Sequence, residues 1–471
     1  MRLAFALYGR TAGTIERGGG RMTLSYLPEY LNTPDATPLS LSMPLSDQKY
    51  STRPVEAYLR GLLPDRADVR ERWATKAGVQ PGDTLGLIAS VGLDVSGGAI
   101  FAAEEELEDA MRRPGAIIPA TEGDIAAKLR RIRTDEAAWQ DEDDHWSLAG
   151  AQSKFTLVHT EAGWGFASGT TPSTHIAKPG ISRIPAQALS EHVSMRAFRL
   201  AGLPVADTQY LTFEDQSAIV VTRFDRRESS GATIRLHHED LCQAFALDPR
   251  RKYEADGGPG VQRIADLLRA TTSDDSLERF VRAVIANQII GAPDAHAKNY
   301  GLLLAGTTAT LTRLYDVATG LIPDELGRLP YGKGAMAVGG ERRFGDLERS
   351  NWERFASAVR LPAGQIVGWV EELAATLPPA FERAAGEIAR PEADVLAERV
   401  TPVIAAVARQ TLEGLTSTRR RHGRIVTPFL QTVPGSIEGF IGVVGDKVAE
   451  PLTIDEMNDV IAGGWAGEQQ G

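Results

Sequence analysis

The residues best suited to chemistry lie in one short segment, Asp294-Ala-His-Ala-Lys-Asn299, which follows an apolar helical stretch and precedes a predicted strand. Asp316 ends the strand pair that comes next. Phosphoryl transfer needs a carboxylate to accept the proton of the attacking hydroxyl, and an amide and a second carboxylate to hold Mg²⁺ against nucleotide phosphates. In protein kinases the base Asp and the metal-binding Asn are five positions apart on one loop, as Asp294 and Asn299 are here. We therefore predict a kinase site in which Asp294 is the base and Asn299 and Asp316 hold the metal.

Two further residues of this segment, His296 and Lys298, are candidate contacts to the nucleotide. We expect His296 to be a packed loop histidine that orients its neighbours rather than an acid or a base. Lys298 is also a candidate catalytic group, because an ammonium beside Asp294 would neutralise the transferring phosphoryl group. A surface or capping role for Lys298 is the open alternative.

Kinases also need a lysine from the strand-rich part of the domain, and a glutamate on the neighbouring helix holds that lysine. Lys178 ends a predicted strand, and Glu191 lies on the predicted helix that follows. Taken alone, Lys178 would be interpreted as a solvent-facing strand end. Because it precedes the Asp294 segment in the order that a kinase requires, we predict that it contacts the nucleotide.

Two glycine-bearing segments could bring the backbone close to a phosphate. Gly150 lies between Ala149 and Ala151 directly before a predicted strand, so this segment could offer backbone N–H groups to an anion. It lacks the G-x-G-x-x-G pattern, and a plain turn is the alternative. The segment 256–260 is explained equally well by a tight chain reversal, and we leave it outside the predicted site.

The first 105 residues have the pattern of a small α+β unit, in which short alternating segments are followed by segments with the apolar period of helices. Residues 106–145 are rich in charge and suit a connector between domains. The predicted elements are strands at 3–8, 22–26 and 39–43, helices at 55–63 and 84–91, and a connector helix at 124–133.

Residues 146–424 form a larger predicted unit with two parts. Residues 146–240 alternate like strands around one helix, and residues 241–424 are mostly helical. A strand-rich part followed by a helix-rich part predicts a bilobed α+β fold, and the cleft between such parts is a favoured ligand site. The predicted strands are 154–159, 165–168, 174–178, 208–213, 218–224, 301–304 and 310–315, and the predicted helices are 187–201, 261–268, 277–290, 351–359, 363–373 and 395–415.

Composition excludes several classes of protein. The 471 residues include 51 Lys plus Arg and 62 Asp plus Glu, which gives a net charge of −11 and argues against a dedicated DNA or membrane-surface binder. The lone Cys242 excludes an internal disulfide and a cysteine-based zinc site. The first apolar run is too short for a signal peptide, and no window of about 18 residues is apolar throughout, so we expect a cytoplasmic protein.

Several segments occur together in a fixed order: Ser147-Leu-Ala-Gly-Ala-Gln-Ser-Lys154, Thr174-His-Ile-Ala-Lys178, Arg223-Phe-Asp-Arg-Arg227, Tyr253-Glu-Ala-Asp-Gly-Gly-Pro-Gly260, Asp294-Ala-His-Ala-Lys-Asn299 and Tyr315-Asp316. Together they resemble the HipA family of bacterial serine/threonine kinase toxins over about residues 1–425. The segments 41–45, 62–65 and 83–98 resemble the N-terminal domain of that family. The resemblance implies a protein-kinase-like fold, with an N-lobe at 146–240 and a C-lobe at 241–424, preceded by a small α+β domain at 1–105.

The resemblance also implies roles for individual residues. Asp294 is the catalytic base, Asn299 and Asp316 hold Mg²⁺, and Lys178 contacts the phosphates of ATP. Ser147 matches the serine that family members phosphorylate on themselves, which expels the phosphate loop and switches the kinase off; the new negative charge would face a phosphate site. The phosphate loop comprises Ala149, Gly150, Ala151, Gln152, Ser153 and Lys154, the segment Thr222, Arg223 and Phe224 lies against adenine, and Tyr315 adjoins the nucleotide beside Asp316.

Members of this family act in toxin–antitoxin pairs. The resemblance implies a helix-turn-helix antitoxin of the HipB type as partner, with operator DNA reached mainly through it. It also implies a protein substrate such as an aminoacyl-tRNA synthetase, most often the glutamyl enzyme. Two alternatives stay open. Phosphoinositide kinases share an Asp-x-His-x-x-Asn loop, which allows a lipid or small-molecule kinase, and a silent pseudokinase could serve as a corepressor scaffold, although Lys178, Asp294, Asn299 and Asp316 are all present.

The sequence departs from the family pattern at three places. Ser153 stands where the phosphate loop of the family usually has Glu, and Thr222 replaces a residue that usually differs. Residues 425–471 extend beyond the usual end. Their role stays open, and an interaction or self-regulatory element is one hypothesis for them. Arginines at 419–421 and 424 form the one dense basic cluster, which is a solvated helix end or a local anion-binding patch.

Overall fold

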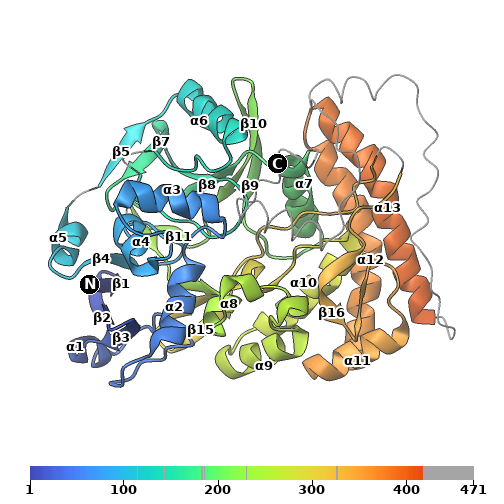
Figure 1. The fold of residues 1–471 in the computed structure, drawn as a ribbon. Coiled ribbons are helices and arrows are strands. Elements are labelled where there is room, and N and C mark those ends of the chain that lie inside the picture. The colour runs from blue at the N-terminus through green and yellow to red at the C-terminus, as the bar shows by residue number, and fades with distance from the viewer. Residues whose placement is uncertain are drawn as a thin grey trace, which may run out of the picture.

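The structure, a computed structural model, describes residues 1–416 apart from residues 114, 142–143, 182–183, 185, 230 and 325–326. The predicted extension at 425–471 and the arginine cluster at 419–424 lie outside the described residues. Figure 1 shows the N-terminal sheet, the larger sheet next to it, and a helical lobe at the opposite end of the molecule. Within the described part of the chain, no helix is long and apolar enough to cross a bilayer.

An antiparallel four-stranded sheet, ordered β3-β2-β1-β4, forms the N-terminal unit. Helices α2 and α4 pack against it, and their apolar residues share a core with Phe5 and Phe101 of the sheet. Strand β2 and helix α3 were not predicted from the sequence. The elements are β1 (Arg2–Leu7), β2 (Arg10–Gly18), β3 (Arg21–Tyr26), β4 (Ile100–Ala103), α1 (Pro28–Leu31), α2 (Thr52–Gly61), α3 (Ala67–Ala77), α4 (Thr84–Val91) and α5 (Leu107–Arg112).

The predicted strand at 39–43 is wrong, since only an isolated bridge joins Ser40 to Met43 there. The hydroxyl of Tyr26 accepts a hydrogen bond from the Leu39 N–H at 2.9 Å and donates one to the Met43 carbonyl at 2.6 Å. A side chain therefore satisfies backbone groups that a neighbouring strand would otherwise take. Of the alternating apolar residues, Leu39 and Met43 are buried and Leu41 is half-buried, but all three lie in a loop.

A six-stranded sheet, ordered β5-β7-β6-β8-β10-β9, forms the N-lobe. Its edge strand β5 comes from the predicted connector, and helix α6 of the same stretch packs on β9 and β10. The charged segment is therefore a folded part of this lobe. The elements are β5 (Ala116–Pro119), α6 (Glu122–Thr134), β6 (Phe155–Thr160), β7 (Gly163–Ser168), β8 (His175–Lys178), α7 (Gln187–Leu200), β9 (Thr208–Phe213), β10 (Gln216–Thr222), β11 (Arg226–Ser229) and β12 (Ala232–Arg235).

The C-lobe is mostly helical, as predicted, and the long helices α12 and α13 lie side by side in it (Figure 1). Helix α7 of the N-lobe packs against α12, so the two lobes meet there. The elements are β13 (His238–Asp240), α8 (Leu241–Ala244), η1 (Pro249–Arg251), η2 (Glu254–Asp256), α9 (Val261–Thr271), α10 (Ser276–Ile290), η3 (Ala297–Asn299), β14 (Gly301–Ala305), β15 (Thr308–Leu311), β16 (Lys333–Val338), β17 (Glu341–Arg343), α11 (Arg349–Val359), α12 (Ala363–Gly386) and α13 (Pro391–Thr416).

The N-terminal unit and the N-lobe are joined by a buried cluster of charges. The carboxylate of Asp94, 4% exposed, accepts hydrogen bonds from Arg226 at 2.8 Å and from the Ser173 hydroxyl at 2.6 Å. Arg223, 1% exposed, lies 3.5 Å from Asp94 and 2.7 Å from Asp225. The same two parts also share one apolar core, so they fold against each other as a single body.

We expect Asp94→Ala to destabilise the protein by about 3–5 kcal/mol, because the single carboxylate of Asp225 would then face the buried charges of both Arg223 and Arg226. Urea unfolding measures this loss. Asp35→Ala is the matched control: Asp35 pairs with Arg10 at 2.9 Å, but the two side chains are 74% and 54% exposed, and exposed pairs contribute at most about 1 kcal/mol. Equal losses for the two variants would contradict a stabilising role for the buried cluster.

Candidate active site

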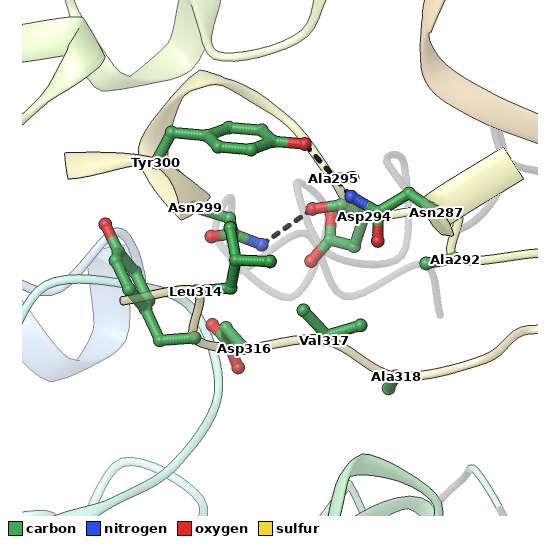
Figure 2. A pocket seen from close by; sticks show the side chains of 11 residues that line it. Asn287, Ala292, Asp294, Ala295, Asn299, Tyr300, Leu314, Asp316, Val317 and Ala318 are labelled. Carbon is green, nitrogen blue, oxygen red and sulfur yellow. Dashed lines mark hydrogen bonds between the residues drawn. The ribbon is translucent and has the colours of Figure 1, made fainter. Parts of the chain in front are cut away.

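The segment 294–299 forms a loop between α10 and β14. Helix α10 ends at Gly291, whose left-handed backbone (φ 65°) turns the chain out of the helix. The side-chain amide nitrogen of Asn299 donates a hydrogen bond to the Asp294 carbonyl at 2.6 Å, which locks the loop across the predicted five-residue interval (Figure 2). The Asp294 side chain is 47% exposed, so its carboxylate can meet a substrate hydroxyl.

Asp316 lines the same pocket as Asp294 and Asn299 (Figure 2). The side-chain oxygens of these three residues could serve as metal ligands. The backbone of Asp316 is left-handed (φ 61°), a conformation that residues other than glycine seldom adopt and that is concentrated at functional sites. Mg²⁺ binds one or two carboxylates together with substrate phosphates, so an Asp carboxylate and the Asn299 amide oxygen fit it. The remaining lining residues are Asn287, Ala292, Ala295, Tyr300, Leu314, Tyr315, Val317 and Ala318.

Lys178, at the end of β8, joins the two lobes at this pocket. Its ammonium lies 2.7 Å from Glu191 Oε1 on α7 and 2.5 Å from Asp316 Oδ1. The Lys178 side chain is 7% exposed. Burial lowers the pKa of Lys178, but the carboxylates of Asp316 and Glu191 outweigh burial and raise that pKa above its usual range. The lysine therefore stays charged where a nucleotide phosphate would bind.

The predicted phosphate loop turns back over Lys154. Gly150 has a left-handed backbone (φ 103°), and a Cβ there would lie 2.6 Å from the Lys154 ammonium. That ammonium donates a hydrogen bond to the Ala149 carbonyl at 2.7 Å. Burial and the nearby charge of Lys178 lower the pKa of Lys154 to about 8. Only glycine fits at position 150 in this conformation, which the sequence pattern alone did not establish.

Other residues of this segment bond away from the pocket. Ser147 is fully buried, and its hydroxyl donates to the Leu62 carbonyl at 2.6 Å in the N-terminal unit. The hydroxyl of Ser153 donates to the Glu136 carbonyl at 3.0 Å. The amides of Gln152 and Gln187 bond to each other at 2.7 Å, which ties the loop to the start of α7.

Lys298 is directed at buried carboxylates rather than at solvent. Its ammonium lies 3.0 Å from Asp65 Oδ1 and 3.9 Å from Asp240 Oδ2. Burial lowers the pKa of Lys298, but these carboxylates outweigh burial and raise it above its usual range. The alternative of a surface lysine is wrong, since the residue is 6% exposed. Its contact with a phosphoryl group stays a prediction.

His296 is a packed loop residue in the structure, 3% exposed. Burial lowers its pKa to about 4, so the ring is neutral near pH 7. It packs edge-on against Tyr253 with ring centroids 4.8 Å apart, and the Tyr253 hydroxyl donates a hydrogen bond to the Asp294 carboxylate. Tyr253 thus touches the predicted base, although it is not among the predicted site residues.

The predicted adenine segment begins at the last residue of β10. The ring of Phe224 stacks on Tyr315 with centroids 5.3 Å apart, and the Tyr315 hydroxyl donates to the Lys298 carbonyl at 2.8 Å. Thr222 ends β10. The Arg223 side chain is bound to Asp94 and Asp225, so only its backbone can face a nucleotide. The structure therefore brings Lys178, Asp294, Asn299 and Asp316 together, whereas the side chains of Arg223 and Ser147 point into the domain interface.

Sequence reasoning missed two residues at this site, Asp65 and Tyr253. Each contacts a predicted catalytic residue from a part of the chain that is distant in sequence. The one available signal was that both lie in segments, 62–65 and 253–260, that carry the family resemblance.

Two family models and several curated proteins match this chain. Residues 146–381 match the HipA-like C-terminal domain family, and residues 3–101 match the HipA N-terminal domain family. "Putative kinase Y4mE" of Sinorhizobium fredii is 30% identical over 350 residues, which cover 73% of this chain and 82% of that protein. The serine/threonine-protein kinase toxin HipA of Shewanella oneidensis is 27% identical over 372 residues, which cover 73% and 80% of the two chains.

A solved complex of Shewanella oneidensis HipA, HipB and operator DNA contains a chain with the same fold. The TM-score is 0.74 at 22% sequence identity, and the match covers 87% of this chain and 97% of that one. This likeness confirms the predicted bilobed kinase-like fold with its small N-terminal α+β domain. From the two domain matches and these relatives, the chain belongs to the HipA family of kinases.

Proposed function

We propose that this protein is an ATP- and Mg²⁺-dependent serine/threonine protein kinase that acts as the toxin of a toxin–antitoxin pair. The observation that carries the proposal is the position of Lys178, which pairs with Glu191 of α7 and with Asp316 beside the loop of Asp294 and Asn299. A lysine held by a helix glutamate, next to a base and two metal-binding groups, is the set that phosphoryl transfer to a hydroxyl requires.

Each residue has a distinct task in this proposal. Asp294 accepts the proton of the attacking serine or threonine hydroxyl, and the hydrogen bond from Tyr253 orients its carboxylate. Lys178 binds the phosphates, and Asn299 and Asp316 supply the oxygens for Mg²⁺. When bound, Mg²⁺ supplies positive charge against the phosphates. In this proposal the phosphate loop lies against the phosphates, and Phe224 lies against the adenine.

The proposed partners rest on the family. We infer a helix-turn-helix antitoxin of the HipB type, because the structurally similar Shewanella toxin was solved with HipB and operator DNA. The net charge of −11 fits a cytoplasmic kinase that reaches operator DNA mainly through that partner. As substrate we propose a serine of an aminoacyl-tRNA synthetase, with the glutamyl enzyme as first choice.

We further propose that Ser147 is an autophosphorylation site that switches the enzyme off. Its hydroxyl is buried against the Leu62 carbonyl at 2.6 Å, so Ser147 must leave this position before it can accept a phosphoryl group. A phosphoserine carries nearly two negative charges, so it cannot occupy the buried position beside Leu62. Its phosphate oxygens are acceptors, so it also cannot donate a hydrogen bond to the Leu62 carbonyl. The phosphorylated loop would therefore stay displaced.

We expect Asp294→Ala to lower phosphoryl transfer by at least about 100-fold, because it removes the general base. Mass-spectrometric mapping of phosphosites, after incubation of each purified protein with Mg-ATP, checks this. We expect phosphate on Ser147 in the protein that keeps Asp294 and none in Asp294→Ala. Transfer to a lipid or a metabolite instead of protein would favour the small-molecule alternative. Nucleotide binding without any transfer would favour a pseudokinase.

We expect Lys178→Met to lower phosphoryl transfer by about 100-fold or more, since it removes the charge that binds the phosphates. Lys128→Met is the matched control: Lys128 is also buried, with carboxylate oxygens of Asp141 and Asp144 at 2.8 and 2.9 Å, but it lies away from the pocket. Initial rates, normalised to the folded fraction, should fall only for Lys178→Met. Equal falls in the normalised rates would contradict a specific role of Lys178 at the phosphates.

A further inference from the structure

One stretch of the N-terminal unit, residues 62–65, holds the predicted phosphate loop at two points. The Leu62 carbonyl accepts the hydrogen bond from the Ser147 hydroxyl at 2.6 Å. The Asp65 N–H donates to the Gly150 carbonyl at 2.9 Å, and Pro64 and Gly150 form a parallel bridge. The position of the loop therefore depends on a segment outside the kinase lobes.

The side chain of Asp65 reaches the catalytic loop as well. Its Oδ1 lies 3.0 Å from the Lys298 ammonium, and its Oδ2 lies 3.4 Å from the Lys252 ammonium. The Lys252 carbonyl in turn accepts a hydrogen bond from the Ala297 N–H at 3.1 Å. One carboxylate of the N-terminal unit thus holds the loop of Asp294 both through Lys298 and through Lys252.

The charges in this contact depend on Asp65. The Asp65 side chain is 1% exposed; burial alone would raise its pKa, but the ammonium groups of Lys298 and Lys252 outweigh burial and hold that pKa well below its usual range. The next carboxylate, Asp240, is 3.9 Å from Lys298, and one of its oxygens already accepts a hydrogen bond from the Gln243 N–H. Without Asp65, two buried lysines would lose their close counter-charge.

We propose that Asp65 is a positioning residue for phosphoryl transfer, and that the N-terminal unit completes the kinase site by holding the phosphate loop and the catalytic loop in one fixed relation. The inference rests on the proposed kinase function. Asp65 touches neither nucleotide nor substrate and acts through Lys298 and Gly150. Because the same segment holds Ser147, displacement of Ser147 removes one of the two hydrogen bonds that join residues 62–65 to the chain around the phosphate loop.

A double-mutant cycle tests whether Asp65 acts through Lys298. We expect Asp65→Asn to lower kcat by about 10- to 100-fold, the range caused by small displacements of reacting groups, with the KM for ATP changed by less than about threefold. In the background of Lys298→Met, Asp65→Asn should lower kcat little further, because residues that act as one unit are not additive. A full, additive effect of Asp65→Asn in that background would overturn the proposal.

The matched control is Asp94→Asn. Asp94 belongs to the same unit, is equally buried and also pairs with cations of the N-lobe, but its carboxylate touches neither loop. Because Asp94 also pairs with Arg223 of the predicted adenine segment, kcat is compared at saturating ATP. We expect Asp94→Asn to lower the melting temperature and to leave this kcat of the folded enzyme unchanged. If Asp65→Asn behaves in the same way, Asp65 serves only the stability of the interface and the proposal fails.

Hydrogen–deuterium exchange separates this proposal from the proposed function, because it requires no activity. Asp65→Asn should speed exchange in both segments 148–154 and 294–299, and Asp94→Asn should not. The Ser147 N–H is left out of the comparison because it donates to the Asp94 carbonyl at 2.9 Å. If the unmodified protein transfers no phosphate but exchange responds in this way, the contact stands and the kinase proposal fails. If it transfers phosphate and exchange is unchanged in Asp65→Asn, the positioning role fails. Should Asp65→Asn not fold, Asp65→Glu, which keeps the charge but alters its reach, takes its place in both measurements.

Discussion

The candidate active site depends on the ammonium of Lys178, which forms ion pairs with the carboxylates of Glu191 and Asp316. An ammonium in the protein interior is stable only with close counter-charges, so β8, α7 and the segment of Asp316 must come together at this spacing. A nucleotide phosphate carries the same sign of charge as Asp316. It can therefore replace Asp316 as a partner of Lys178 while Glu191 keeps the lysine in place.

Further buried charges join the N-terminal unit to both lobes. The Asp94 cluster fixes this unit against the N-lobe, and Asp65 reaches past the N-lobe to Lys298 in the C-lobe. Apolar surfaces alone would tolerate small shifts between the domains. Charges that are buried in pairs do not, because any other arrangement leaves an ion without a partner. Together with the shared apolar core, these buried charges restrict how the N-terminal unit can sit against the two lobes.

Local pattern explains why much of the site could be predicted from the sequence. Asp294 and Asn299 lie on one loop, and their spacing along the chain fixes their distance in space. Helix α4 and strand β9 have the predicted bounds, because capping residues and apolar periodicity act within one element. The segment 39–43 shows the limit of this reasoning: alternation predicted burial correctly, but the hydroxyl of Tyr26 took the backbone groups that define a strand.

The sequence by itself determined the family and the order of the strand-rich and helix-rich parts. It also predicted Lys178, Asp294, Asn299 and Asp316 as site residues, since each follows from residue type and position along the chain. Only the tertiary structure showed that Asp65 pairs with Lys298 and that the hydroxyl of Tyr253 binds Asp294. The physical reason is that periodicity records which face of an element is buried, whereas the partner of a buried charge is chosen by packing between segments that are far apart in sequence.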